Sequence, residues 1–338
     1  MAKVKQEDYA YATARIRARE PKLLSRSRLE RLFEIKDYSD AVRIMVESGY
    51  SNEQADSRKS GAENLDDILS AELAKTYDLI CEMIPDPQVL NLFRKRYDYL
   101  NAKLILKAEA LKLEVRETLS ELGTIEPGKL LKSISGRKLS DLPEIFSEAI
   151  TESLGVFNAS GDPQMIDFIM DKASLRDMAE DAIASEDPFL IKLVDMLIDT
   201  ANLRILIRSK LLNKPDDFIK KAWISGGSFS NKLFEEMENK GLNNLFDVLK
   251  SLGQERLAAD LSEAIGQFDG ISEIEKILDD YITHLLKQGK FVTMGIEPVI
   301  GYLFFKETEI KNARLIITGV MNKIPRETIK ERLRLGYA

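Results

Sequence analysis

The chain has 338 residues, of which 31% are charged and 44% hydrophobic, and its formal net charge is −7. These values are typical of a folded globular protein and exclude a disordered chain. No run of about 18 apolar residues occurs, so no membrane span is expected, and an acidic chain without interleaved aromatic and basic residues argues against nucleic-acid binding.

Two residue types that carry much enzyme chemistry occur once each, as Cys81 and His284. They cannot supply the four ligands of a zinc site. A lone Cys forms no internal disulfide, so Cys81 is expected to be a small buried residue, and His284 is expected to be structural or exposed. The sequence therefore predicts no catalytic residue, no cofactor, no metal and no small-molecule substrate. A hydrolase that uses two carboxylates stays a minor alternative. The chain has 56 Asp and Glu residues, and among so many acids a neighbouring pair is weak evidence for acid–base catalysis.

In chain order, the first recurring element is a short helix with one apolar face. Apolar residues at i, i+3 and i+4 form such a face, and a preceding Ser or Asn is a favourable N-cap. The element occurs three times, about 100 residues apart: Ser39 before Ala41, Ile44 and Met45; Ser140 before Leu142, Ile145 and Phe146; and Asn243 before Leu245, Val248 and Leu249.

A second, longer helix is predicted by a period near 3.6 residues at 65–84, 165–183 and 274–286. No alternating strand pattern or Asn-Gly hairpin accompanies it, so the predicted fold class is all-α. Loops are expected at 51–63, 123–128, 158–163, 225–228 and 287–294. Gly226 and Gly227 lack the Lys-Ser/Thr ending of a phosphate-binding loop, so they predict a turn, with Ser228 as a cap.

The third element is the most informative one. An acid-Pro pair is followed eleven residues after the Pro by an acid, three residues later by Asn and two later by a base. The three copies are Asp86-Pro87 with Asp98, Asn101 and Lys103; Asp187-Pro188 with Asp199, Asn202 and Arg204; and Glu297-Pro298 with Glu309, Asn312 and Arg314. Such recurrence predicts an internal repeat.

Each copy predicts one long helix. The acid can accept the free N–H groups of the first turn, where Pro loses no hydrogen bond, and Pro215 and Pro325 would stop the second and third helices. Those two helices would be about 40 Å long. Because Asn costs about half a kcal/mol inside a helix, we expect a role for it: hydrogen bonding to its acid and locking helices between modules, with partner contact as the alternative.

Together the elements predict three similar helical-bundle modules, at residues 1–100, 101–201 and 202–311, followed by a C-terminal helix at 312–338 that closes onto module 1. Thr13 stands where a partial fourth copy near the N-terminus would have Asn. Residues 1–36 hold ten bases against five acids, and residues 323–338 hold five bases against two acids. If the ends lie together, they form a basic sector for an acidic partner or anionic headgroups; solvated faces with mixed ion pairs are the alternative.

These residues resemble the C subunit of archaeal and bacterial V/A-type ATP synthases, the counterpart of the d subunit of eukaryotic V-ATPases. The resemblance covers the whole chain and is most specific at Glu297-Pro298-Val299-Ile300-Gly301-Tyr302, at Lys306-Glu307 and from Glu309 to Leu315. Thr13 is the visible departure, where a family member would often have Asn.

The resemblance implies a non-catalytic funnel of three domains around a pseudo-threefold axis. It would be the central-stalk socket that joins the shaft subunits (D/F type) to the membrane proteolipid ring (c/K/L type), so that ATP hydrolysis or synthesis is linked to proton or sodium transport. The expected location is the cytoplasmic side of the membrane, within a membrane-bound complex. The alternative is a helical-repeat scaffold or adaptor unrelated to rotary ATPases.

Overall fold

A computed structural model describes residues 4–51, 61–115, 119–265 and 270–336, and these residues form helices and loops without any strand. The predicted all-α fold class is confirmed. The chain divides into two compact units, one made of Met1–Pro87 and Asp260–Ala338 and the other of Gln88–Ala259. No described helix combines the length and apolarity that a bilayer crossing requires.

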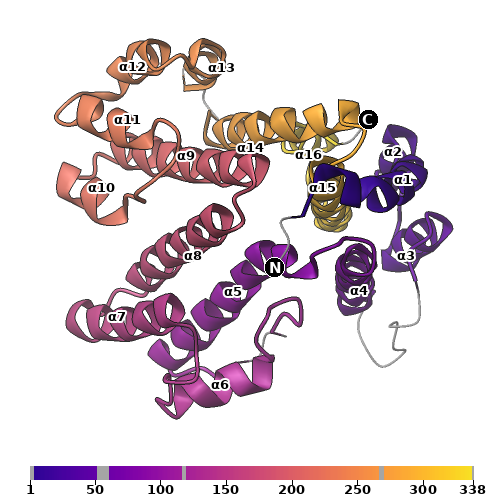
Figure 1. Cartoon of the computed structure of the whole chain (residues 1–338), viewed down its shortest axis with the longest axis horizontal. Coiled ribbons are helices and arrows are strands. Elements are labelled where there is room, and N and C mark those ends of the chain that lie inside the picture. Colours follow the sequence, from indigo (N-terminus) through magenta and orange to yellow (C-terminus); the bar gives the residue numbers. More distant parts are fainter. Residues whose placement is uncertain (1–3, 52–60, 116–118, 266–269, 337–338) are drawn as a thin grey trace. The chain divides into compact units, whose positions relative to one another are not determined.

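The first unit joins the two ends of the chain in one core (Figure 1). Helix α15 contacts α1, α2 and α4, and Ile310, Ala313, Ile316 and Ile317 on it are buried among residues of α2, α3 and α4. The helices of this unit are α1 (Ala10–Arg19), α2 (Arg26–Leu32), α3 (Tyr38–Glu47), α4 (Gly61–Cys81), α14 (Gly270–Gln288), α15 (Glu297–Met321) and α16 (Arg326–Glu331).

The second unit packs α5, α6, α7 and α8 around a core in which the Tyr99 and Phe146 rings meet edge to face, 4.7 Å between centroids. Helix α8 also contacts α9, against which α10 and α11 pack. The helices of this unit are α5 (Asn91–Ala110), α6 (Pro127–Ser135), α7 (Glu144–Ser160), α8 (Gln164–Ala184), α9 (Pro188–Leu211), α10 (Asp216–Ala222), α11 (Ser230–Met237) and α12 (Leu245–Ser251). Helix α13 (Glu255–Ile265) spans the division.

The predicted helix starts are only partly right. Asp187 caps α9, accepting the N–H groups of Phe189 and Leu190 at 2.9 and 3.1 Å. In the first copy a 3₁₀ turn, Pro87–Leu90, separates the acid from the start of α5. In the third, α15 begins at Glu297 itself and Ile296 is the N-cap. The acid of that copy therefore lies inside the first helical turn and not at the cap.

The short amphipathic helices also start at residues other than the predicted caps. Asp37, not Ser39, caps α3, because its carboxylate accepts the Asp40 N–H at 2.9 Å. Ser140 lies before α7, whose N-cap is Pro143, and Asn243 belongs to a 3₁₀ turn before α12. The apolar faces are nonetheless in place, since all nine predicted residues except the half-buried Ile145 are buried.

The long helices end earlier than the prolines suggested, and by one shared device. Lys112, Asn213 and Lys323 each follow a long helix with φ between 51 and 57°, and the next N–H reaches back to a carbonyl in the last turn at 2.8 to 2.9 Å. This is a Schellman ending. It occurs in the first copy, which has no Pro, so the helix stop depends on the left-handed residue.

The other long helices, α4, α8 and α14, confirm the predictions at 65–84, 165–183 and 274–286 to within a few residues. The predicted loops at 225–228 and 123–126 are loops, whereas Gly128 lies in α6 and residues 158–160 lie in α7. Most of the predicted loop at 51–63 lies outside the described residues. Cys81 is half-buried, not fully buried as expected, because it occupies the last residue of α4.

Candidate functional site: loop anchors on the long helices

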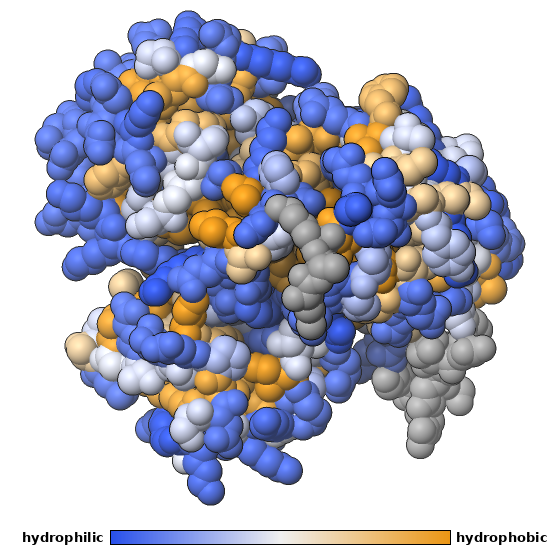
Figure 2. All heavy atoms as spheres, viewed as in Figure 1, coloured by the Kyte–Doolittle hydropathy of each residue, from blue (hydrophilic) through white to orange (hydrophobic). Residues whose placement is uncertain are grey.

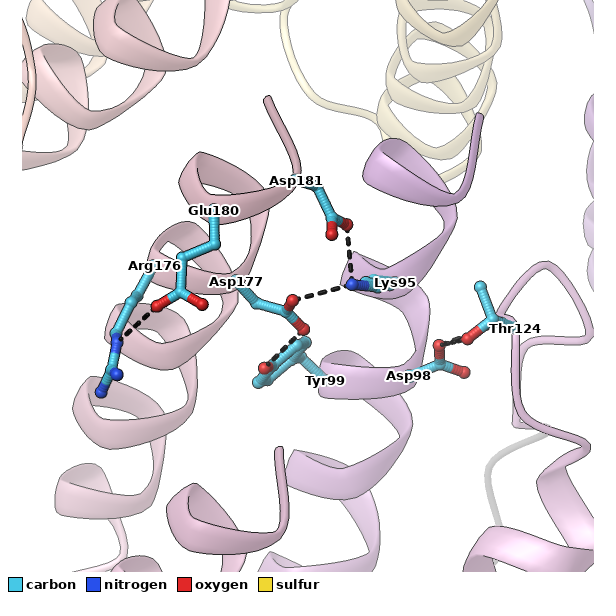
Figure 3. Close-up of polar contacts among 8 residues, drawn as sticks. All are labelled: Lys95, Asp98, Tyr99, Thr124, Arg176, Asp177, Glu180 and Asp181. Atoms are coloured by element: carbon cyan, nitrogen blue, oxygen red, sulfur yellow. Dashed lines mark hydrogen bonds and ion pairs between the residues drawn. The ribbon is translucent and has the colours of Figure 1, made fainter. Parts of the chain in front are cut away.

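On α5, the repeated Asn and acid hold the segment that follows the helix. Asn101 donates from Nδ2 to the Ser120 carbonyl, and its Oδ1 accepts the Ser120 N–H, both at 2.8 Å. Asp98 accepts the N–H groups of Thr124 and Ile125 at 2.9 and 3.0 Å and the Thr124 hydroxyl at 2.6 Å (Figure 3). We call such a pair of side chains, together with the backbone they hold, a loop anchor.

The second copy on α9 repeats this arrangement. Asn202, fully buried, exchanges hydrogen bonds with the Ile224 carbonyl and N–H at 2.8 and 2.9 Å. The Asp199 carboxylate accepts the N–H and hydroxyl of both Ser228 and Ser230, and a longer bond from Phe229. The glycine turn that superficially suggested a phosphate loop therefore wraps around a carboxylate of the protein itself.

The third copy on α15 is completed from both ends of the chain. Asn312 exchanges hydrogen bonds with the Arg334 carbonyl and N–H, each at 3.0 Å. Its acid, however, accepts the N–H of Leu24 and, at 2.5 Å, the Tyr50 hydroxyl. The carboxylate that in the other copies holds a downstream loop thus holds the N-terminal segment.

The loop anchors differ from the expected contacts. The sequence predicts that each Asn binds its own acid and locks one helix to another. Instead, the Asn and the acid each bind backbone groups of a segment outside their helix. The N–H and C=O groups of that segment have no partners in a helix of their own, and the two side chains on one face of the long helix supply those partners. Thr13, in the partial fourth copy, is buried and its hydroxyl donates to the Gly295 carbonyl at 3.4 Å.

The bases make the helix-to-helix contacts. Lys103 on α5 pairs with Asp171 on α8 at 2.6 Å, and Arg314 on α15 pairs with Asp66 on α4 at 2.8 Å. Asp171 and Asp66 lie on two of the long helices that the sequence predicts as equivalent, α8 and α4. Arg204 on α9 lines a hollow between α8 and α9.

A glycine approaches the acid in each of the first two loop anchors. A Cβ at Gly123 would lie 2.1 Å from Asp98 Oδ1, and one at Gly227 would lie 2.3 Å from Asp199 Oδ1. Gly227 also has a φ of +80°, a backbone conformation that residues other than Gly adopt at a cost of about 1 to 2 kcal/mol. The loop can therefore close around the carboxylate only because no side chain intervenes.

Gly227→Ala should lower the free energy of unfolding by at least about 2 kcal/mol, because it adds backbone strain and a clash with an oxygen that neighbouring donors hold in place. Urea denaturation measures the change. Gly155→Ala is the matched control: its Cβ would meet nothing within 4 Å, so in helix α7 it should stabilise slightly. Equal stability of the Gly227 variant and the wild type would contradict a tightly closed anchor.

Buried charges surround the third loop anchor. Lys306 pairs with Glu309 at 2.8 Å and with Glu72 of α4 at 3.1 Å, and its side chain and that of Glu309 are only 6% and 5% exposed. The ammonium also lies 4.7 Å from the centre of the Tyr50 ring. Burial alone would lower the pKa of Lys306, but the carboxylates of Glu309 and Glu72 outweigh it and raise that pKa.

The first loop anchor adjoins a polar contact between α5 and α8. Lys95 lies between Asp177 and Asp181, at 2.8 and 2.7 Å, and the Tyr99 hydroxyl donates to Asp177 at 3.0 Å (Figure 3). Burial and the neighbouring carboxylates raise the pKa of Tyr99, so it stays a donor. Burial also raises the pKa of Asp98, although three donors to its carboxylate oppose that effect.

Sequence reasoning missed Lys95, Asp177, Glu72 and Tyr50, since each matters only through a partner far away in the chain. Lys306 lies within the stretch of strongest resemblance, but nothing in its spacing indicated burial.

The basic ends of the chain both belong to the first unit, and several of their charges are paired within it. Arg31 pairs with Glu47 and Arg326 with Glu30 and Glu34, and Arg334 pairs with Asp279 of α14 at 2.5 Å. Ion pairs within the unit therefore account for part of the basic charge at the two ends.

In the part of the chain that the structure describes, the polar side chains of the site stabilise the fold. Among the described residues, no group of three His, Cys, Asp or Glu side chains is placed to hold a metal ion, and His284 is exposed on α14. On each long helix the predicted site residues lie close together. The Asn and the acid bind backbone groups, and Lys103 and Arg314 pair with acids of other helices. Such anchors fix loops relative to helices.

Fold and site together define an all-helical protein in which three long helices carry loop anchors, and the acid of the third anchor holds the N-terminal segment in place of a following loop. Residues 12–332 match the model of the ATP synthase (C/AC39) subunit family, and the chain belongs to that family. This confirms the resemblance to the C subunit of V/A-type ATP synthases.

The chain is similar to named relatives along nearly its full length. It is 25% identical to the C subunit of the A-type ATP synthase of Methanocaldococcus jannaschii, over 96% of this chain and 86% of the relative. It is also 25% identical to the C subunit of the V-type sodium ATPase of Enterococcus hirae, over 95% and 97%. Identity to the C subunit of the A-type ATP synthase of Pyrococcus horikoshii is 24%, over 97% and 90%.

Proposed function

We propose that this chain is a non-catalytic central-stalk subunit of a V/A-type rotary ATPase. It would be the socket between the rotating shaft and the membrane proteolipid ring, so that ATP hydrolysis or synthesis is linked to ion transport. The observation that carries the proposal is the family match over residues 12–332. An adaptor unrelated to rotary ATPases is not favoured by that match.

The loop anchors support a load-bearing role. A torque-transmitting part must not let its loops shift against its long helices. Each anchor holds its segment by hydrogen bonds to backbone groups, which are directional. The third anchor joins the last long helix to the N-terminal segment through Leu24 and Tyr50. An open repeat array, whose modules contact only their neighbours, lacks such a closure.

The finer parts of this role belong to the same proposal. The three modules at 1–100, 101–201 and 202–311 would surround a pseudo-threefold axis as a funnel. The partners would be shaft subunits of the D/F type and proteolipids of the c/K/L type, on the cytoplasmic side of the membrane.

Removal of this subunit should separate ATP turnover from ion movement. Membranes from a deletion strain should lose ATP-driven ion uptake, while the detached catalytic head keeps hydrolysing ATP. The affinity-tagged chain should co-purify with shaft and proteolipid subunits from detergent-solubilised wild-type membranes. Normal ATP-driven uptake without the subunit would contradict the proposal.

A further inference from the structure

A hollow of about 390 Å³ opens on the surface of the second unit between α7, α8 and α10. Each helix contributes one stripe of its surface to the lining, from Ile145 to Val156 on α7, from Met165 to Arg176 on α8 and from Phe218 to Ala222 on α10. The stripes of α7 and α8 each cover eleven steps of helix, which correspond to about 16 Å. We call this hollow the α7–α10 hollow.

The interior of the hollow is apolar. Helix α8 contacts both α7 and α10, so it forms the floor and the other two helices form the walls. Phe168 of α8 meets Phe218 of α10 edge to face, with ring centroids 5.3 Å apart. A notch between the parts that carry α7 and α10 is visible at the left edge of Figure 2. Three helices whose stripes surround an apolar space have the geometry of a four-helix bundle without its fourth helix.

The two walls of the hollow carry opposite charges. Glu148 and Glu152 lie one turn apart on α7, and Lys172 of α8 and Lys221 of α10 line the other side; all four side chains are exposed. Among the residues that the structure describes, none lies within hydrogen-bond or ion-pair distance of any of these four side chains. Arg176, at the end of the stripe, is already paired. The four charges are therefore available to a partner.

We propose that the α7–α10 hollow binds one helix of a partner protein, with an apolar stripe flanked by Lys or Arg on one side and by Asp or Glu on the other. An apolar space bounded by three helical stripes has the shape that receives a further helix. Glu148 and Glu152 lie about 6 Å apart along α7, so bases at i and i+4 of the partner helix would meet both. Its acidic flank would meet Lys172 and Lys221. One of the two walls would repel a helix that carried the same charge on both flanks.

The test uses the full chain and a labelled synthetic helix of about 18 residues, with Leu at i, i+3, i+4 and i+7, Lys along one flank and Glu along the other. Fluorescence anisotropy should show saturable binding. The double variant Glu148→Lys/Glu152→Lys should weaken it about tenfold at low salt. A second peptide, with Glu on both flanks, should bind this variant more tightly than it binds the wild type, because the reversed wall now attracts acids.

The matched control is Glu114→Lys/Glu121→Lys. It reverses two exposed acids that lie outside the lining of the hollow and changes the net charge by the same amount. This variant should bind the first peptide as the wild type does. Because all four substituted acids are exposed, both double variants should fold. No saturable binding, or equal binding by the wild type and the α7 variant, would overturn the proposal.

A variant that fills the hollow tests the shape without changing any charge. Ala173 is half-buried and lines the hollow on α8, so a Phe side chain there would occupy the space. Ala173→Phe should abolish peptide binding while the melting temperature stays close to that of the wild type, whereas full binding by a folded variant would contradict the proposal. If sedimentation shows dimers of the wild type that Ala173→Phe abolishes, a second copy fills the hollow and the proposal is wrong.

A second arm, which rests on the proposed function, uses the assembled complex. A photo-crosslinking residue in place of Val156, which is half-buried at one end of the hollow, should join this chain to a helix of a fellow subunit with oppositely charged flanks, identified by peptide mass spectrometry. Crosslinks only to segments without that pattern would overturn the inference while leaving the rotary role intact. Failure to co-purify with any rotary subunit would instead contradict the proposed function.

Discussion

Glu309→Gln should lower the free energy of unfolding by about 3 kcal/mol, a large effect for one side-chain atom. The substitution leaves one amide oxygen, which can accept from Leu24 or from Tyr50 in place of the two carboxylate oxygens. It also removes the charge opposite Lys306, whose side chain is 6% exposed. Removing one partner of a buried ion pair leaves the other charge uncompensated and costs about 3 to 5 kcal/mol; Glu72, at 3.1 Å, retains part of the pairing. Urea denaturation measures the change.

A matched ion pair at the surface provides the control. Glu47→Gln breaks the pair with Arg31, whose side chains are 48% and 55% exposed, and should cost less than about 1 kcal/mol. The double variant Glu309→Gln/Lys306→Met should lose less than the two single variants added together, because it removes both members of this pair and only Glu72 loses a partner. Strict additivity would show that the two groups do not interact.

The pH dependence of the same pair has a definite sign. The pKa of Lys306 is raised in the folded state, since the carboxylates of Glu309 and Glu72 outweigh burial. The folded protein therefore holds this proton more tightly than the unfolded chain does. The resulting stability is fully present below the unfolded pKa, about 10.4, and is lost as pH rises through the higher folded value. Lys306→Met should thus be destabilised by a constant amount from about pH 7 to 9, with the gap narrowing only at more alkaline pH.

Asn202→Leu should lower the free energy of unfolding by about 3 kcal/mol. Leu matches the size of Asn but leaves the N–H and carbonyl of Ile224 unpaired in a buried place, and each such group costs about 1 to 3 kcal/mol. Asn312→Leu should cost less, because the N–H and carbonyl that it frees belong to Arg334, which is half-buried, whereas Ile224 is buried. Thermal melting followed by circular dichroism should rank the two variants in this order.

Asn158→Leu serves as the control, because Asn158 is exposed on α7. It should change the melting temperature little. Hydrogen exchange adds a local measurement: in Asn202→Leu the amide of Ile224 should exchange faster than in the wild type. Unchanged melting and unchanged exchange at Ile224 would refute the loop-anchor role of this side chain.

Local patterns identified the helices because a helix depends on neighbours within four residues. The stretches at 65–84, 165–183 and 274–286 became α4, α8 and α14, and the repeated acid, Asn and base marked equivalent places on α5, α9 and α15. Helix ends were harder to predict. The end depends on a residue in the left-handed conformation, such as Lys112, and no proline marks that position in the sequence. The partners of Asp98 and Asn101 were beyond prediction, because a loop about twenty residues away can fold in many ways.

The sequence by itself determined the helical class, the repeat and the family, since periodicity, N-cap chemistry and recurring motifs are properties of neighbouring residues. Only the tertiary structure decided what the repeated side chains bind. Glu309 is the clearest case: its spacing matches that of Asp98 and Asp199, yet it accepts from Leu24 and pairs with a buried Lys306. Contacts between the two ends of a chain depend on how the helices pack, and that packing is set by the whole core.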